Sequence, residues 1–345
     1  MRPLANGYRD TMKICIVGAG AIGGMLGVKL ALAGHAVSLI LRGANLAAVA
    51  ADGLTLLEED GQQLQVRPAL VTDVIARAGV QDLVILGMKA HQVAAVAPQL
   101  GGLLHDGTRI VTMQNGIPWW YFHKLPGPYQ GTAIMAVDPD GTIARHIDVD
   151  RVIGSVVYPA SIVLRPGVIQ VIEGNRFTLG EIDGSDTPGV RAISDAFKAA
   201  GFKAPVSRDI RSEIWLKLWG NLSFNPISAL THATLQEICE HEPTRALAAD
   251  MMREAQTIGE KLGVQFKVSL ERRIAGAQAV GQHKTSMLQD VEQGRPMELQ
   301  ALVGSVVELG RITGTPTPAI DAVHALASLL AAKLQTRGAA LRFPD

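Results

Sequence analysis

Short apolar runs alternate with stretches of helical periodicity through the first part of the chain. The apolar runs have the length of strands and lie at 13–17, 36–41, 83–87 and 109–113. Helical spacing follows the first and third of them, at 21–33 and 91–100. Such alternation is typical of βαβ units with parallel strands. The pattern therefore predicts an α/β domain built on a mostly parallel, doubly wound sheet.

The pattern changes further along the chain. The pair Asp60-Gly61 predicts a hairpin within residues 53–66. Strand-like pieces that we expect to be antiparallel, and to extend the first domain, follow at 132–137, 152–158, 167–172 and 177–180. Beyond 207 almost the whole sequence shows amphipathic helical spacing. We therefore predict a Rossmann-type domain over 12–207 and an all-α domain over 208–340.

A glycine-rich turn connects the first strand pattern to the first helical pattern. In such a turn Gly18 would allow the tight bend, Gly20 would let backbone amides approach a pyrophosphate, and Gly23 would let the helix pack against the strand. Ala21 and Ile22 would stand in the first helical turn, where free N–H groups and the helix dipole favour an anion. A structural turn without a ligand is the alternative, but the strand-turn-helix context favours dinucleotide binding.

Arg42 lies at the end of the second strand pattern, where NAD-binding folds place an acidic residue that accepts hydrogen bonds from the ribose. A guanidinium cannot accept those bonds, but it pairs well with a phosphate. The position therefore favours the 2′-phosphate of NADPH over NADH. A solvated arginine at a strand end is the alternative.

Composition narrows the class of protein. With 345 residues, of which 48% are hydrophobic, the chain can form two domains with substantial cores. The 32 basic and 32 acidic residues cancel, which argues against a nucleic acid or a membrane surface as partner. Cys15 and Cys239 suggest no disulfide framework.

We expect neither a signal peptide in the N-terminal segment nor a membrane-spanning helix among the apolar runs. Residues 1–11 read as a short polar extension without the apolar core of a signal peptide. No uncharged run approaches the roughly 18 residues of a membrane span. We expect a soluble cytoplasmic protein with a small-molecule ligand. A homodimer is an arrangement that the sequence leaves open.

Polar residues in both predicted domains are candidates for a site. Lys89 and Asn115 follow predicted parallel strands at their carboxyl ends, the edge at which ligands bind in open α/β sheets. Lys217, Asn221 and Asn225 recur every four residues and so form one polar stripe in an otherwise apolar helical segment. Ordinary loop polar groups and a solvated helix face are the alternatives.

Two further candidates flank the break at 294–296, where glycine is expected to end one helix and Pro296 to stand in the first turn of the next. Ser286 lies on the first of these helices and Glu298 in the first turn of the second, where the helix dipole would favour a carboxylate in any case. The acidic cluster at 237–242 lacks a recognised ligand spacing, so we expect no metal site.

Taken together, these motifs resemble the ketopantoate reductase (2-dehydropantoate 2-reductase) family. The resemblance covers most of the chain and rests on motifs in the family's order: the glycine loop, Arg42, and the segments 89–92, 114–116, 215–226, 286–290 and 294–298. It implies a Rossmann domain followed by a helical domain like the C-terminal domain of 6-phosphogluconate dehydrogenases. The active site would lie in the cleft between them.

The resemblance also implies a reaction and a role for each residue. The family reduces ketopantoate with NADPH on the pathway to pantothenate and coenzyme A. Lys217 matches the catalytic lysine, and Glu298 matches the acid that holds the far hydroxyl of the substrate. Asn115, Asn221, Asn225 and Ser286 match substrate-binding positions, and Arg42, Lys89 and Asn115 match cofactor contacts. A lysine with its ordinary pKa of about 10.4 would be charged at neutral pH and ready to donate a proton.

The chain departs from the family at Gln300 and Val303, where an Asp and an Asn are common. These departures leave two alternatives open. One is a related NADP-dependent 2-oxo acid reductase or 2-hydroxy acid dehydrogenase with another substrate. The other is a non-catalytic NADP-binding sensor, which the survival of the lysine-centred residues disfavours.

Overall fold

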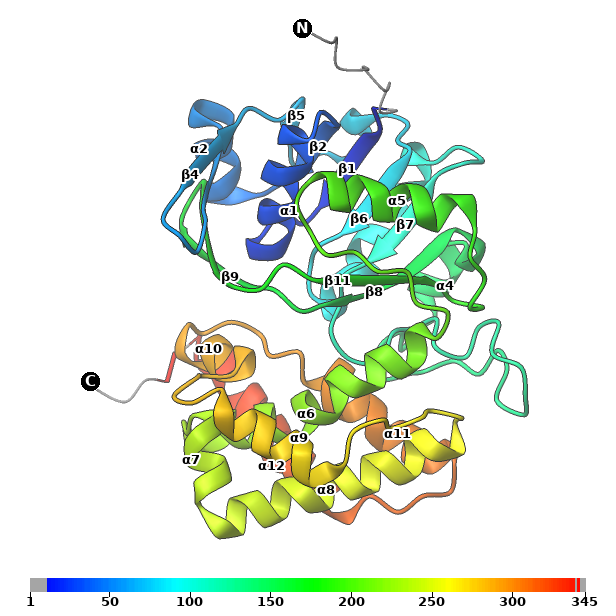
Figure 1. Cartoon of the computed structure of the whole chain (residues 1–345), viewed down its shortest axis with the longest axis vertical. Coiled ribbons are helices and arrows are strands. Elements are labelled where there is room, and N and C mark those ends of the chain that lie inside the picture. Colours follow the sequence, from blue (N-terminus) through cyan, green and yellow to red (C-terminus); the bar gives the residue numbers. More distant parts are fainter. Residues whose placement is uncertain (1–10, 339, 342–345) are drawn as a thin grey trace, which may run out of the picture.

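The computed structural model describes residues 11–338 and 340–341, so most of the polar extension at 1–11 lies outside the described residues. A sheet-bearing domain stands above a helical domain (Figure 1). The main sheet has seven strands in the order β11-β8-β7-β6-β1-β2-β5. Its strands are β1 (Lys13–Val17), β2 (Ala36–Ile40), β5 (Leu70–Thr72), β6 (Leu83–Leu86), β7 (Arg109–Thr112), β8 (Val152–Val157) and β11 (Phe177–Glu181). All neighbours pair in parallel except β11, which runs antiparallel to β8.

The α/β class and the Rossmann order of the first units are confirmed, but a second sheet was not predicted. It has the order β4-β3-β10-β9 and comprises β3 (Leu54–Leu57), β4 (Gln63–Val66), β9 (Ala160–Arg165) and β10 (Val168–Glu173). The hairpin predicted around Asp60-Gly61 joins β3 to β4. The piece at 167–172 pairs in parallel with β3 and so does not extend the main sheet.

The second sheet covers the first helix, α1 (Ala21–Leu32), whose other side packs on the main sheet. Ile169 of β10 lies so close to α1 that a Cβ added at Gly24 would meet its side chain at 2.8 Å. On the main-sheet side, a Cβ at Gly27 would meet Leu39 at 3.0 Å. Burial on two sides explains why α1 is apolar nearly all round rather than amphipathic.

Three local predictions for this domain were wrong. Residues 91–100 do not form one helix but a chain of short turns: η2 (Ala90–Gln92), α3 (Val93–Val96) and η3 (Ala97–Leu103), which contains Pro98. The expected strand at 132–137 forms turns, because Glu308 of the helical domain accepts hydrogen bonds from Met135 N (2.8 Å) and Ala136 N (2.7 Å). The piece at 152–158 forms β8, which is parallel to β7 rather than antiparallel.

The remaining connections of this domain are α2 (Gly43–Asp52), η1 (Ile75–Ala78), α4 (Thr142–His146), η4 (Val149–Arg151) and α5 (Pro188–Ala199). After β11 the described residues contain no strand, as predicted for the second domain. Its helices are α6 (Ile210–Thr231), α7 (Leu235–Glu240), α8 (Glu242–Lys261), α9 (Leu270–Ala279), α10 (Ser286–Glu292), α11 (Ser305–Ile312) and α12 (Pro318–Arg337). Among the described residues, no helix has the length and apolar character needed to span a bilayer.

The helix after the break at 294–296 starts differently from the prediction. Pro296 and Glu298 lie in an irregular connection just before the helix, which begins at Leu299 with a π-helical turn, η5 (Gln300–Gly304). The carbonyl of Ala301 in this turn accepts hydrogen bonds from Ile117 N of the Rossmann domain (2.9 Å) and from Ser305 Oγ (2.7 Å). A π turn leaves a carbonyl free of the regular helical ladder. Here that carbonyl is the one of Ala301, and it binds the other domain, so a contact between the domains shapes the start of this helix.

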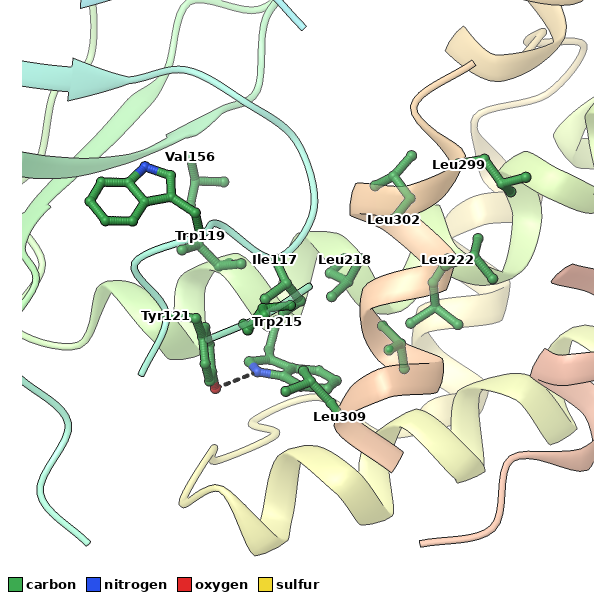
Figure 2. Close-up of a cluster of buried hydrophobic side chains, with 14 of the residues drawn as sticks. Ile117, Trp119, Tyr121, Val156, Trp215, Leu218, Leu222, Leu299, Leu302 and Leu309 are labelled. Carbon is green, nitrogen blue, oxygen red and sulfur yellow. Dashed lines mark hydrogen bonds between the residues drawn. The ribbon is translucent and has the colours of Figure 1, made fainter. Parts of the chain in front are cut away.

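The two domains share one apolar core. Figure 2 shows Ile117 and Tyr121 of the Rossmann domain beside Leu218 and Trp215 of the helical domain, and Trp119 of the same cluster beside Val156. Trp215 Nε1 donates a hydrogen bond of 2.7 Å to the buried hydroxyl of Tyr121. Arg211 of α6 donates to three carbonyls of the first domain, those of Tyr121, Ile182 and His123. This shared core places the start of α6 at the carboxyl edge of the main sheet.

Candidate active site

The ammonium of Lys217 lies where the two domains meet. Lys217 is in the second turn of α6, and its Nζ donates to Asn115 Oδ1 at 2.6 Å and to the carbonyl of Val157 at the end of β8. Asn115, just past β7, donates through Nδ2 to Glu298 Oε2 at 3.3 Å. The structure thus joins Lys217, Asn115 and Glu298, which are far apart in the sequence, into one hydrogen-bonded chain.

Burial changes the acidity of this lysine. It lowers the pKa of the Lys217 ammonium to about 8, while the negative charge of Glu298 acts in the opposite direction. The ordinary value expected from the sequence is therefore wrong at this position, because protein atoms replace the water that would solvate the charge. With a pKa near 8 the group is still about nine-tenths protonated at pH 7. It is a stronger acid than an exposed lysine, which suits proton donation.

A small pocket opens beside Lys217 at the carboxyl ends of β7 and β8. Its lining consists of Gln114, Asn115, Gly116, Ser155, Val156, Val157, Ile214, Lys217, Leu218 and Asn221. The stripe predicted on α6 is therefore split between the pocket, which Asn221 lines, and the interior, where Asn225 is buried one turn later. Neither amide side chain hydrogen-bonds to another described residue. The departures from the family lie elsewhere, since neither Gln300 nor Val303 lines the pocket and Val303 is fully buried.

Ser286 lies outside this chain of contacts. It is the first residue of α10, is exposed, and does not line the pocket beside Lys217. Helix α10 packs against α6, so Ser286 stands on an element next to the site rather than in contact with Lys217.

The glycine loop has the geometry of a dinucleotide-binding turn. Gly18 has φ +87°, and a Cβ there would meet the backbone nitrogen of Met88 at 2.9 Å. A Cβ at Gly23 would lie 2.6 Å from the carbonyl oxygen of Gly18, so this glycine permits close helix packing. Nothing lies within 4 Å of a Cβ at Gly20. The open space at Gly20, in front of Ala21 and Ile22 at the start of α1, fits the pyrophosphate of a dinucleotide.

Arg42 stands at the tip of β2, immediately before α2. Its side chain is exposed and forms no ion pair or hydrogen bond with the described residues. The guanidinium is therefore free to pair with an external phosphate. Its place beside the glycine loop is fixed by hydrogen bonds from the amides of Gly18 and Ala19 to the carbonyl of Ile40, at 3.2 and 3.4 Å.

Lys89 of the Rossmann domain binds two residues of the helical domain. Its Nζ lies 2.5 Å from Asp290 Oδ2 and 2.9 Å from the carbonyl of Pro296. Asp290 is almost fully buried and also pairs with Arg295 at 3.1 Å. Burial and the Lys89 ammonium lower the pKa of the neighbouring His91. Asp290 was not singled out in the sequence, and neither were the carbonyls of Val157 and Ala301, because backbone acceptors leave no sequence signal.

A glycine-loop α/β domain, a helical domain and an enclosed lysine between them define a two-domain dinucleotide-dependent oxidoreductase. The family model for ketopantoate reductase PanE/ApbA matches residues 14–184, and the model for its C-terminal part matches residues 209–331. The 2-dehydropantoate 2-reductase of Mesorhizobium japonicum is 56% identical over 321 residues, which cover 93% of this chain and 98% of that protein. The chain belongs to the ketopantoate reductase family.

Solved structures agree with this assignment. A protein from Ralstonia solanacearum MolK2 assigned to the ketopantoate reductases has a TM-score of 0.89 at 42% identity, with 95% of this chain and 99% of that one covered. The dimeric ketopantoate reductase of Staphylococcus aureus has a TM-score of 0.71 at 21% identity, with 93% and 99% covered. At 21% identity, the likeness to the Staphylococcus protein shows that the two chains share a fold.

Proposed function

We propose that the protein reduces 2-dehydropantoate (ketopantoate) to pantoate with NADPH, a step toward pantothenate and coenzyme A. The observation that carries the proposal is the chain of contacts from Lys217 through Asn115 to Glu298. It sets a proton donor and an amide on the lining of the interdomain pocket, and a carboxylate in contact with that amide. The family and the high identity to the Mesorhizobium enzyme support the substrate.

Proton donation is the task of Lys217 in this proposal. Bound NADPH supplies the hydride, and negative charge develops on the ketone oxygen of the substrate. The Lys217 ammonium stabilises this charge and transfers its proton to the oxygen, which completes the alcohol. Asn115 and the carbonyl of Val157 hold the ammonium in place by accepting two of its three protons, so one remains for the substrate.

The remaining residues take the roles that the family implies. Asn115, Asn221, Asn225, Ser286 and Glu298 bind the substrate, with Glu298 on its far hydroxyl. Gly18, Gly20, Ala21, Ile22 and Gly23 hold the pyrophosphate, and Arg42, Lys89 and Asn115 contact other parts of NADPH. We place the domain boundary between 207 and 208, in the segment before α6. We further propose a cytoplasmic homodimer, supported by the dimeric Staphylococcus enzyme of the same fold.

The direct test is NADPH oxidation at 340 nm by the purified protein, with ketopantoate and a panel of other 2-oxo acids. We expect kcat/KM for ketopantoate of at least about 10⁴ M⁻¹s⁻¹. If only another 2-oxo acid is turned over, the assignment of ketopantoate as substrate is wrong, but the reaction class still holds. Tight NADPH binding without turnover of any acid would favour the sensor alternative.

Arg42→Ala is expected to raise the Kd for NADPH by about 10- to 100-fold and to change the Kd for NADH by less than about threefold. The reason is that only NADPH carries the 2′-phosphate that the free guanidinium of Arg42 would pair with. Fluorescence titration of the two cofactors measures the difference. Equal losses for both cofactors would contradict this role of Arg42.

The pH dependence of kcat/KM should show the titration of Lys217. Because the protonated form is the donor, activity is full below its pKa and is lost as the pH rises through about 8. We expect about a tenfold decrease per pH unit above that value. A profile that stays level to pH 10 would show that Lys217 keeps its proton and that its pKa is not lowered.

A further inference from the structure

A guanidinium without a protein partner lies against helix α6. It belongs to Arg273, in the first turn of α9, a helix that packs on α6. The side chain is half-buried, and none of the described residues forms an ion pair or a side-chain hydrogen bond with it. Burial lowers the pKa of this guanidinium, because protein atoms replace part of its water. A charge that has lost water without gaining a partner indicates a site for an anion from outside the chain.

Gly220 gives this guanidinium its place on α6. A Cβ at Gly220 would lie 2.2 Å from Nη2 and 2.9 Å from Cζ of Arg273. Glycine is unfavourable inside a helix, so its use here fits a position where a side chain would collide with the guanidinium. Gly220 is three residues after Lys217, on the same side of the helix, and directly precedes Asn221, which lines the pocket. The guanidinium therefore covers α6 about one turn beyond the proposed proton donor.

The Rossmann domain approaches Arg273 through the end of β8. The charge of Arg273 counteracts the rise in the pKa of Tyr158. Tyr158 directly follows Val157, whose carbonyl accepts a hydrogen bond from Lys217. Glu213, on the same face of α6, accepts a hydrogen bond of 3.5 Å from the Tyr158 hydroxyl and does not pair with Arg273. The guanidinium is therefore left between α6 and the end of β8, next to the contacts of Lys217.

The place of β8 in the main sheet shows which anion fits. In the proposed complex the phosphates of NADPH bind at the glycine loop after β1 and at Arg42 after β2. The order β8-β7-β6-β1 puts three strand spacings between β8 and β1, about 14 Å at about 4.8 Å each. These phosphates therefore do not reach Arg273. The remaining anionic group of the two reactants is the carboxylate of the 2-oxo acid.

The site residues follow one another in the order of the chemical groups of ketopantoate. In this molecule the ketone stands between the carboxylate and the carbon chain that ends in the far hydroxyl. Along the edge of the main sheet, Glu298 contacts Asn115 just past β7, and Lys217 lies between the ends of β7 and β8. Arg273 acts on Tyr158, just past β8. Glu298, Lys217 and Arg273 can thus meet the hydroxyl, the ketone and the carboxylate in that order.

We infer that Arg273 binds the carboxylate of the 2-oxo acid and is a specificity-determining residue of the site. The inference rests on the function proposed above and assigns the residue that recognises the acid group. The planar guanidinium can donate two parallel hydrogen bonds to a carboxylate. A carboxylate held in this way would fix the neighbouring ketone beside the Lys217 ammonium.

The first experiment removes the guanidinium. Arg273→Ala should raise KM for ketopantoate by about 10- to 100-fold, while kcat and the Kd for NADPH change by less than about threefold. Arg273→Lys keeps the charge without the planar fork and should raise KM by only about 3- to 10-fold. Arg272→Ala is the matched control, because Arg272 is the exposed neighbour on the same helix. It should leave KM within about twofold of the unchanged protein.

The second experiment returns the guanidinium as a small molecule. Methylguanidinium at tens of millimolar should lower the raised KM of Arg273→Ala by at least about threefold, because it can occupy the vacated position and pair with the carboxylate. It should have no such effect on the unchanged protein or on Arg272→Ala. Circular dichroism and the melting temperature show that each variant is folded. A loss caused by a damaged fold would not be reversed by this cation.

The third experiment tests the placement of the guanidinium on α6. Gly220→Ala should displace it and raise KM by about tenfold, but the same change made in Arg273→Ala should raise KM by less than about twofold further. Gly276→Ala is the matched control, since Gly276 is also helical and nothing lies within 4 Å of a Cβ there. This control should not alter KM.

The results separate the role of Arg273 from the proposed reaction. An unchanged KM in Arg273→Ala, a raised KM that methylguanidinium does not lower, or independent effects of Gly220→Ala and Arg273→Ala would each overturn the role of Arg273. If the unchanged protein reduces no 2-oxo acid, the proposed function is wrong. Calorimetric titration of ketopantoate into the protein saturated with NADP⁺, which has no hydride to give, then still tests Arg273. An equal Kd with and without Arg273, or no binding to either protein, would overturn the inference.

Discussion

Replacing Lys217 by alanine is expected to lower kcat by about 10²- to 10⁴-fold at pH 7, while the Kd for NADPH changes by less than about threefold. The lysine is the one cation in contact with Asn115 at the pocket among the described residues, so its removal leaves the developing charge on the ketone oxygen without a proton donor. The cofactor loop at the start of α1 is untouched. Steady-state kinetics and fluorescence titration measure the two effects.

A control is needed because Lys217 also donates a hydrogen bond to the carbonyl of Val157, so its removal could lower stability as well as activity. Lys261 is suited to this purpose, since its ammonium hydrogen-bonds to Thr315 Oγ1 at 2.8 Å and to the carbonyls of Thr313 and Gly314 at 3.1 and 3.3 Å. Lys261→Ala should cost stability without a comparable loss of kcat. Added primary amines should partly restore the activity of Lys217→Ala and should have no such effect on Lys261→Ala. An unchanged kcat in Lys217→Ala would remove this residue from the mechanism.

The second large effect is expected at Gly116, which contacts the π turn of the helical domain. Gly116 has φ +86°, and a Cβ there would lie 2.1 Å from the carbonyl oxygen of Ala301. Because the obstacle is backbone, a side chain cannot move aside to relieve it. Gly116→Ala should lower the free energy of unfolding by about 3 kcal/mol or more. It should also lower kcat/KM by at least about tenfold, because Asn115 is the preceding residue and contacts both Lys217 and Glu298.

Gly61 provides the matched control for Gly116. Its φ is +83°, nearly the same, but nothing lies within 4 Å of a Cβ at this position. Gly61→Ala therefore isolates the cost of the left-handed backbone, about 1 kcal/mol, and should leave kcat/KM unaltered. Urea denaturation of the two variants gives the difference. Equal losses of stability would show that the domains separate at Ala301 at little cost.

Much of the Rossmann domain could be predicted because its signals are local. The apolar run at 13–17, the glycine turn and the helix that follows are adjacent in sequence, and they form β1, the loop and α1 as expected. The hairpin around Asp60-Gly61 depends on turn residues in the same way. Likewise, the uniform helical spacing after 207 predicted an all-α domain without any knowledge of its partners.

The wrong predictions fall where distant segments decide the local structure. Residues 132–137 have strand-like composition, yet the carboxylate of Glu308 takes up two of their backbone donors, and a strand needs those donors for its ladder. β10 pairs with β3, far earlier in the chain, and so forms a second sheet over α1. Such pairings depend on the whole topology and have no local signature.

By itself, the sequence determined the type of site and its candidate residues, because the glycine spacing, Arg42 and the lysine-asparagine stripe carry their chemistry in residue identity. The tertiary structure alone decided that Lys217, Asn115 and Glu298 touch. It also decided that Lys89 pairs with Asp290 and that burial brings the pKa of Lys217 to about 8. These properties arise from the distance between groups and from the exclusion of water, and both exist only once the two domains pack together.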